Sequence, residues 1–336
     1  MIPAALVALS LLGGAAVAAA EELPCAPESQ FLPAKDVPEV DIGFCSEWNP
    51  EFGLRGTGCC VSKGGRGRKR RGPGRCSPTR AKTSFCDEMT DKQKEYVASV
   101  QSGKIRDPLE FLKGELKKRG EPQAFCSVND GFLVDGRRLL STPRNRIVLR
   151  SPTRCVDFGT DHMVAMLEHV ASRVWERYSG PEFSRARIIV GDIAAPRGGC
   201  LVGRSGRKGH ASHTSGQDAD IGFFNPIAGR ASEEHFSRTF DPATNWVFLK
   251  ELLENPIVCI KRVFLDRRLI GKLAKVAKDD PLWPTARKVI QHQKHHRNHF
   301  HVRIGEGPGP MGCAAKDDDD SETADGDELE SAIEHE

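Results

Sequence analysis

The amino-acid sequence predicts an α+β fold, in which a small, mostly antiparallel sheet with flanking helices is preceded by a Cys-rich irregular module. Two observations support this prediction. After residue 144, short apolar stretches of strand length alternate with amphipathic stretches of helix length. Before residue 87, six cysteines lie in a region that is rich in Gly and Pro and has no hydrophobic period.

The chain divides into five predicted segments. Residues 1–20 have no charged side chain and end in small residues, which predicts a signal peptide and export. A membrane anchor is the alternative, but this segment is short and only mildly hydrophobic. Residues 21–89 form the Cys-rich module, whose cysteine density favours disulfide bonds. The other segments are a helical connector at 90–127, the main domain at 128–313 and a disordered acidic tail at 314–336.

The composition, 38% hydrophobic and 28% charged residues, excludes a membrane-embedded protein and a wholly disordered one. The net charge of +3 conceals two segments of opposite sign. Seven positive charges between Lys63 and Arg75 form a basic arm, whereas eleven acids against one Lys give residues 316–336 a net charge of −10. The arm has no aromatic residue for base stacking and export is expected, so nucleic acid is not a predicted partner.

Each element of the main domain follows from the spacing of its apolar residues. Alternation or continuous apolar runs predict strands, and apolar residues three and four apart predict helices. The predicted strands are 146–149, 186–193, 219–224, 257–266 and 299–304. The predicted helices are 161–178, which Thr160 or Asp161 caps, 245–254, 269–278 and 281–293, and residues 90–118 form one helical region in the connector.

The motif HQKHHRNHFHVRI, residues 292–304, ends in a predicted strand with two different faces. Residues two apart on a strand point to the same side, so His299, His301 and Arg303 share one face. The apolar residues between them face the core. Two imidazoles on the polar face form a pair of nitrogen ligands, although a solvated His-rich run is the alternative for this motif alone.

The motif GHASHTSGQDADI, residues 209–221, adds a carboxylate to these ligands. His213 precedes Asp220 by seven residues, and the Ser and Gly residues between them permit a turn. Two neutral imidazoles and one carboxylate fill three positions of a tetrahedral Zn²⁺ and leave the fourth to water, as in catalytic zinc sites. The two motifs therefore predict such a site. Asp218 and Asp192 are either hydrogen-bond partners of ligand imidazoles or solvated strand-end carboxylates.

These two motifs and GDIAAPRGG, residues 191–199, resemble the motifs of the penicillin-insensitive murein endopeptidases. That family is part of a wider group of zinc peptidases, which includes lysostaphin-type enzymes, D-alanyl-D-alanine metallopeptidases and the hedgehog signalling domain. The resemblance covers roughly residues 128–305. It implies a periplasmic, zinc-dependent endopeptidase that hydrolyses peptide cross-links of bacterial peptidoglycan, at D-alanyl to diamino acid amide bonds. From the composition, no stable membrane insertion is expected once the signal peptide is removed.

The resemblance also implies which residues bind the metal. His213, Asp220 and His301 match the zinc ligands of the family. His210 is either an additional ligand or an active-site neighbour. A further acid and histidine pair of the family has no clear counterpart around residues 233–241, which argues against a second metal site.

Catalytic roles follow from the same resemblance. His299 matches the catalytic imidazole of the family, and His296 matches another active-site histidine. The chain has no H-E-x-x-H motif and so lacks the glutamate base of many zinc peptidases. His299, on the strand face of His301, is the better candidate, either as the general base or as an imidazolium that helps to hold the oxyanion, and His296 shares or orients that work. Two alternatives stay open: a D-alanyl-D-alanine carboxypeptidase, and a non-hydrolytic, zinc-containing protein that binds the cell wall.

Overall fold

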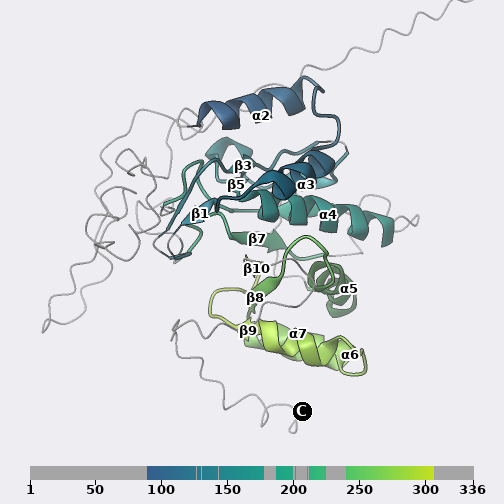
Figure 1. The fold of residues 1–336 in the computed structure, drawn as a ribbon. Helices are drawn as coiled ribbons and strands as arrows, with labels where there is room; N and C mark the ends of the chain where they lie inside the picture. The colour runs from purple at the N-terminus through teal and green to yellow at the C-terminus, as the bar shows by residue number, and fades with distance from the viewer. Residues whose placement is uncertain are drawn as a thin grey trace, which may run out of the picture.

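The computed structural model describes residues 89–125, 127–129, 131–142, 144–177, 187–199, 201, 210, 212–224 and 240–305 (Figure 1). The predicted signal peptide, the basic arm and the acidic tail lie outside these residues, as does the Cys-rich module apart from Met89. None of the described helices is both long and apolar enough to cross a membrane.

The helical region predicted at 90–118 consists of two helices, α2 (Asp91–Gln101) and α3 (Pro108–Lys118), and is not continuous. Thr90 caps α2 in a capping box with Gln93. Asp107 caps α3 by accepting a hydrogen bond from the backbone N–H of Glu110. The break has a local cause, because Pro108 cannot continue a preceding helix but is well suited to the first position of a new one.

Six strands form the main sheet, in the order β4-β6-β7-β10-β8-β9. Their bounds are Ile147–Leu149 for β4, Ile188–Val190 for β6, Asp218–Gly222 for β7, His299–Ile304 for β10, Ile260–Leu265 for β8 and Ile290–His292 for β9. The pairs from β6 to β8 are antiparallel, but β4–β6 and β8–β9 are parallel. The sheet is therefore mixed: its three central pairs are antiparallel, in agreement with the predicted mostly antiparallel sheet, and its two outer pairs are parallel.

The helix predicted at 281–293 ends earlier than expected. Helix α7 covers Trp283–Val289, and the chain then continues directly into β9, which pairs with β8. Two further ladders join very short strands: β1 (Ala124–Phe125) with β2 (Phe132–Leu133), and β3 (Arg137–Arg138) with β5 (Phe158–Gly159). Strands of two residues leave no periodic signal in a sequence.

The remaining helices occur close to their predicted positions. They are α4 (Asp161–Arg177), α5 (Pro242–Leu253) and α6 (Arg267–Ala277). Asp241 caps α5 and Asp266 caps α6, each through a side-chain oxygen that accepts a backbone N–H. A short 3-10 helix, Pro152–Arg154, precedes β5.

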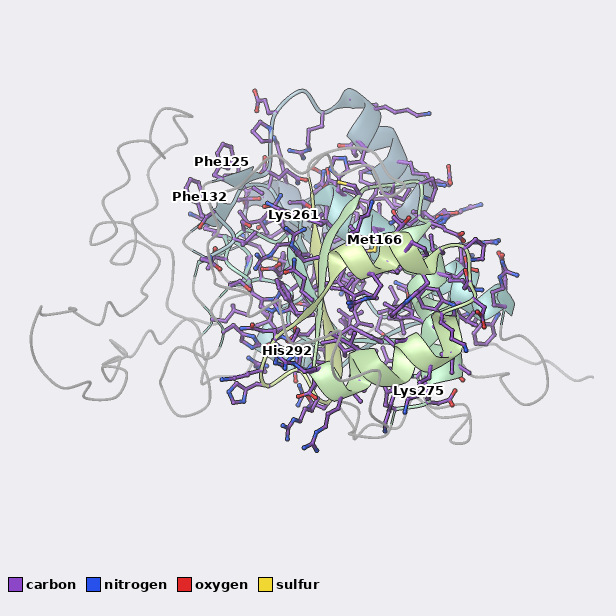
Figure 2. All side chains as sticks on the ribbon, turned by 90° about the horizontal axis from the view of Figure 1, so that it is seen from below. Phe125, Phe132, Met166, Lys261, Lys275 and His292 are labelled. Atoms are coloured by element: carbon purple, nitrogen blue, oxygen red, sulfur yellow. The ribbon has the colours of Figure 1, made fainter. Side chains whose placement is uncertain are left out.

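One hydrophobic core joins these helices to the apolar face of the sheet (Figures 1 and 2). Phe300 and Val302 of β10 are fully buried, and Phe248 of α5 stacks on Phe300 with ring centroids 5.4 Å apart. Figure 2 shows Met166 of α4 within the packed interior and Lys275 of α6 at the periphery. Each large apolar side chain buried in this way contributes about 1.5–3 kcal/mol. The core thus fixes β10, whose other face carries the histidines.

Candidate metal centre

Two neighbouring strands bring the two histidine motifs together. In the antiparallel pair β7–β10, His301 lies opposite Asp220 and Arg303 lies opposite Asp218. Residues directly opposite each other in such a pair point to the same side of the sheet. His301 and its neighbours on this face are polar, whereas Phe300 and Val302 on the other face are buried in the core. The predicted orientation of β10 is therefore confirmed.

His213 reaches this face from the turn before β7. Its backbone has a φ of 72°, in the left-handed region that side chains other than Gly rarely adopt. Two contacts hold the residue in place: its backbone N–H donates to Asp218 Oδ2 at 3.2 Å, and its Nδ1 lies 2.9 Å from the carbonyl oxygen of Ile193. The imidazole is completely buried. A strained residue of this kind is typical of functional sites, where the surrounding structure compensates about 1–3 kcal/mol of strain.

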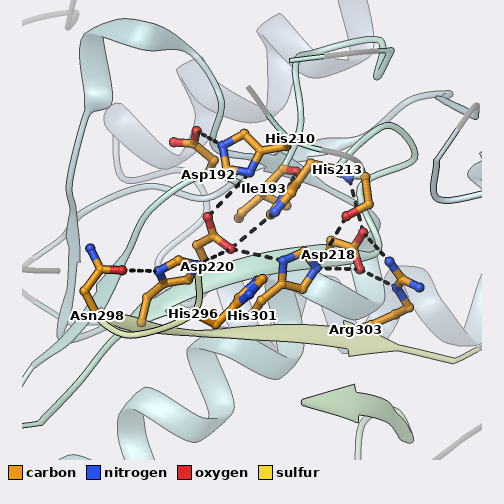
Figure 3. Close-up of polar contacts among 12 residues, drawn as sticks. Asp192, Ile193, His210, His213, Asp218, Asp220, His296, Asn298, His301 and Arg303 are labelled. Atoms are coloured by element: carbon orange, nitrogen blue, oxygen red, sulfur yellow. Dashed lines mark hydrogen bonds and ion pairs between the residues drawn. The ribbon is translucent and has the colours of Figure 1, made fainter. Parts of the chain in front are cut away.

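Asp220 lies at the centre of four imidazoles (Figure 3). Its Oδ1 is 3.3 Å from Nε2 of His213 and 3.4 Å from Nδ1 of His301. The same oxygen is 3.5 Å from Nε2 of His299. Its Oδ2 is 3.9 Å from Nδ1 of His210. The structure thus brings the predicted ligands and the predicted base around one carboxylate.

The contact between His213 and Asp220 is not a hydrogen bond. His213 Nε2 and Asp220 Oδ1 are both buried, and neither has a hydrogen-bond partner although they lie 3.3 Å apart. A neutral imidazole that donates its Nδ1 proton to the Ile193 carbonyl has only a lone pair at Nε2. That lone pair faces a carboxylate oxygen, and two buried acceptors facing each other are costly. A cation between them removes this cost, so these atoms fit a metal ion.

The side chains also meet the distance requirement for a shared ion. One ligand atom from each of His210, His213 and Asp220 lies within 4.8 Å of the others, which makes these residues a possible metal-binding group. His210 therefore lies among the candidate ligands. His301 adjoins the group through Nδ1.

One ring nitrogen of His299 faces Asp220, and the other is held by a hydrogen bond. Its Nδ1 is hydrogen-bonded to Asn298 Oδ1 at 2.8 Å, and its Nε2 points toward Asp220. Because an amide oxygen only accepts, the proton of the neutral ring is on Nδ1, and Nε2 carries the lone pair. His296 lies further out: its ring centroid is 5.0 Å from that of His299 and 5.4 Å from that of His301.

Asp192 and Asp218 are both partners of imidazoles in this group. Asp192 is hydrogen-bonded to His210 at 3.1 Å, and Asp218 lies 3.3 Å from His301. Both carboxylates are buried, so the alternative of solvated strand-end groups is wrong. Sequence reasoning did not find Arg154, which bonds Asp192 at 2.8 Å, because 38 residues separate the two and no motif links them.

Burial and charge set the protonation of these groups. Burial raises the pKa of Asp220, but His299 and His213 lower it more strongly, so this pKa lies well below its usual range. Burial likewise raises the pKa of Asp218, and His301 and Arg303 hold it well below the usual range. Burial lowers the pKa of His213, but Asp220 foremost raises it to about 9. The ionised carboxylates therefore attract a cation, which is either a proton on His213 or a metal ion.

Part of the chain is similar to a known protein family. Residues 124–245 match the family model described as Penicillin-insensitive murein endopeptidase. The predicted family resemblance is confirmed. The match includes His210, His213 and Asp220 and ends before the second histidine motif.

Three murein endopeptidases are distant homologues of the chain. The proteins named Penicillin-insensitive murein endopeptidase from Pectobacterium atrosepticum, Haemophilus influenzae and Klebsiella pneumoniae are 26%, 24% and 25% identical over 202, 228 and 208 residues. These alignments cover 55%, 62% and 58% of this chain. The chain spans 65%, 73% and 70% of the lengths of these relatives.

Proposed function

We propose that this protein is a zinc-dependent endopeptidase of the periplasm, which hydrolyses D-alanyl to diamino acid amide bonds in the peptide cross-links of bacterial peptidoglycan. The observation that carries the proposal is the buried pair of acceptors, His213 Nε2 and Asp220 Oδ1, within the part of the chain that matches the murein endopeptidases. These two acceptors need a cation between them, and the similarity to murein endopeptidases indicates the class of reaction, the hydrolysis of peptide bonds in murein.

Three side chains would hold the ion and leave a position for water. His213 would contribute Nε2, His301 would contribute Nδ1 and Asp220 would contribute a carboxylate oxygen, and Nδ1 of His210 would be a further ligand or a neighbour. Imidazole nitrogens with a carboxylate suit Zn²⁺, whereas Mg²⁺ and Ca²⁺ favour oxygen ligands alone. A bound Zn²⁺ would supply Lewis acidity, which polarises a carbonyl oxygen and lowers the pKa of water.

His299 would act as the general base. Its Nε2 lone pair accepts the proton of the attacking water, while its Nδ1 keeps its own proton and donates it in a hydrogen bond to Asn298 Oδ1. The resulting imidazolium returns that proton to the leaving amine when the amide bond breaks. Burial foremost lowers the pKa of His296 to about 4, so this neighbouring ring stays neutral at pH 7 and does not compete for the proton.

The proposal is tested with the full chain, purified cross-linked sacculi and mass analysis of the products. Metal analysis should find one zinc per chain, and cross-linked dimers should fall to monomers. A chelator should stop the cleavage, and added Zn²⁺ should restore it. Stems that lose a terminal alanine would identify a carboxypeptidase instead. Bound zinc with no cleavage would identify a non-hydrolytic cell-wall protein.

A further inference from the structure

Two series of polar contacts, which we call contact chains, have the same order of residue types and converge on Asp220. Figure 3 shows the first contact chain and, of the second, Asp192 and His210. Each contact chain begins at an arginine, passes through a buried aspartate and ends at a histidine whose Nδ1 faces Asp220. One contact chain runs through β10 and β7, and the other joins the 3-10 helix after β4 to the end of β6.

The first contact chain is Arg303–Asp218–His301. Arg303 contacts the carboxylate of Asp218 with two nitrogens, Nε at 2.8 Å from Oδ1 and Nη2 at 3.4 Å from Oδ2. Asp218 Oδ1 lies 3.3 Å from Nε2 of His301, whose Nδ1 is 3.4 Å from Asp220 Oδ1. The side chain of Asp218 is completely buried and that of Arg303 is 12% exposed.

The second contact chain is Arg154–Asp192–His210. Arg154 Nη1 is 2.8 Å from Asp192 Oδ1, and Asp192 Oδ2 is 3.1 Å from Nε2 of His210. The Nδ1 of His210 is 3.9 Å from Asp220 Oδ2. In this second contact chain, one arginine nitrogen contacts the carboxylate, whereas in the first contact chain two do. The side chain of His210 is also more exposed than that of His301, 28% against 9%.

The order of these groups determines which ring nitrogen can bind a metal. A neutral imidazole has one N–H, and a carboxylate only accepts, so an aspartate at Nε2 favours the proton there. At His210 this aspartate is nearer than Asp220, at 3.1 Å against 3.9 Å. At His301 the two aspartates are almost equally close, at 3.3 Å and 3.4 Å, and a cation beside Asp220 leaves the lone pair on Nδ1. Ser212 Oγ also approaches His301 Nε2, but at 3.5 Å it is further away than Asp218. A buried carboxylate needs a fixed positive partner, and the arginine supplies it in both contact chains.

We propose that Arg303 and Arg154 are positioning residues, which act through Asp218 and Asp192 to keep Nδ1 of His301 and of His210 directed at the metal position. This inference rests on the proposed metal site but not on the proposed substrate. Loss of Arg303 should weaken metal binding more than loss of Arg154. Arg303 contacts Asp218 with two nitrogens, and Asp218 also accepts a hydrogen bond from the backbone N–H of His213.

The test uses the full chain with Arg303→Gln and Arg154→Gln. Arg177→Gln is the matched control, because Arg177 pairs with Glu251 at 2.7 Å far along the chain from either motif. Zn²⁺ affinity is measured by competition with a chromogenic chelator. The ring nitrogens of the histidines are observed by ¹⁵N NMR in the metal-free protein, and thermal unfolding is followed in parallel.

Loss of a group that orients a metal ligand typically weakens metal binding 10- to 100-fold. We expect a loss in this range for Arg303→Gln, a smaller loss for Arg154→Gln and none for the control. The ¹⁵N signals of His301 and His210 should show a proton on Nε2 in the wild type and a mixture of tautomers in the matching variant. A purely structural role of the arginines would lower the melting temperature without changing the tautomer.

Unchanged affinity together with an unchanged tautomer in either variant would overturn the assignment of that arginine. If Arg303→Gln does not fold, Arg303→Lys decides: it keeps the charge with a single donor group, and an affinity equal to wild type would overturn the proposal. If the wild type binds no zinc, the proposed function fails, and the tautomers still test the positioning.

Discussion

Two buried aspartates of this protein have opposite surroundings. Asp161, at the start of α4, accepts from Arg137 Nε at 3.0 Å, from Arg119 Nε at 3.1 Å and from Gln123 Nε2 at 3.1 Å. All three donors carry hydrogens at any physiological pH. Asp220 is equally buried, but its neighbours are imidazole nitrogens at 3.3–3.9 Å, and its Oδ1 has no hydrogen-bond partner.

The difference separates a structural carboxylate from a candidate ligand. The partners of Asp161 complete its hydrogen bonding, so this cluster needs nothing further to be stable. The histidines around Asp220 are held by Asp192, Asp218, Ile193 and Asn298 with their lone pairs directed inward. Burial alone therefore does not distinguish a structural carboxylate from a metal ligand. The distinction lies in whether the neighbouring groups donate hydrogen bonds to the carboxylate or direct lone pairs at it.

The largest effect is expected for Asp220→Asn. The amide NH₂ can donate to the lone pair of His213 Nε2, which satisfies the site without a cation and removes one charge from it. Zinc affinity should fall by roughly 1,000-fold or more, a loss of about 4 kcal/mol in binding free energy. Calorimetric titration of the metal-free protein with Zn²⁺ measures this. Retention of wild-type affinity would contradict the comparison, because Asp220 would then resemble Asp161.

His299→Ala should separate catalysis from metal binding. The variant keeps the proposed ligands, so its zinc content should equal that of the wild type. Its rate of peptidoglycan cleavage should fall by about 10²–10⁴, the usual contribution of a general base. His295→Asn is the matched control, since His295 is exposed in the same motif and Asn tolerates its φ of 72°. Loss of zinc from the alanine variant would make His299 a ligand.

Asp161→Ala should have the reverse effect on binding and stability. Removing this carboxylate leaves the guanidinium groups of Arg137 and Arg119 without their shared partner, and breaking a buried ion pair costs about 3–5 kcal/mol. Chemical denaturation should show a lower free energy of unfolding, by about 3 kcal/mol, with unchanged zinc stoichiometry. A loss of zinc from the folded variant would show that the two clusters are coupled.

A third buried acid, Glu168, extends the comparison. It accepts one hydrogen bond, from Asn145 Nδ2 at 3.3 Å, and its other oxygen has no partner. Burial, the dominant cause, raises the pKa of Glu168 from 4.5 to about 7. The folded protein therefore holds this proton more tightly than the unfolded chain does. The stabilisation is complete below about pH 4.5 and is lost as the pH rises through about 7, a change of about 3 kcal/mol.

Urea unfolding at pH 4.5 and pH 8 tests this, with Glu168→Gln as the reference. The variant lacks the titrating group, so the free energy of unfolding of the wild type should fall by about 3 kcal/mol more than that of the variant between the two pH values. An equal pH dependence of both proteins would show that Glu168 is ionised in the fold.

The sequence was most informative where the deciding interactions are local. The two faces of β10 follow from alternation along the strand, and His213 and Asp220 belong to one short motif. The break before α3 also had a local signal, Pro108, which a continuous helical region could not accommodate.

Interactions between distant segments could not be predicted in this way. The three residues of β9 continue the amphipathic pattern of α7, and only their pairing with β8 makes them a strand. The parallel direction of the edge strands depends on the connections between elements, which hydrophobic spacing does not encode. Arg154 occupies no recognisable pattern, because its partner Asp192 lies 38 residues further along the chain and only the fold brings the two together.

The position of β10 has a consequence for hydrogen exchange. This strand is bonded along both edges, to β7 and to β8, whereas β4 and β9 each have a single neighbour in the main sheet. Amide protons of a central strand exchange with solvent only when much of the sheet opens, and those of edge strands exchange through local fraying. Removal of the proposed ion should therefore leave the amides of β10 slowly exchanging, and the protein should bind the metal again without refolding.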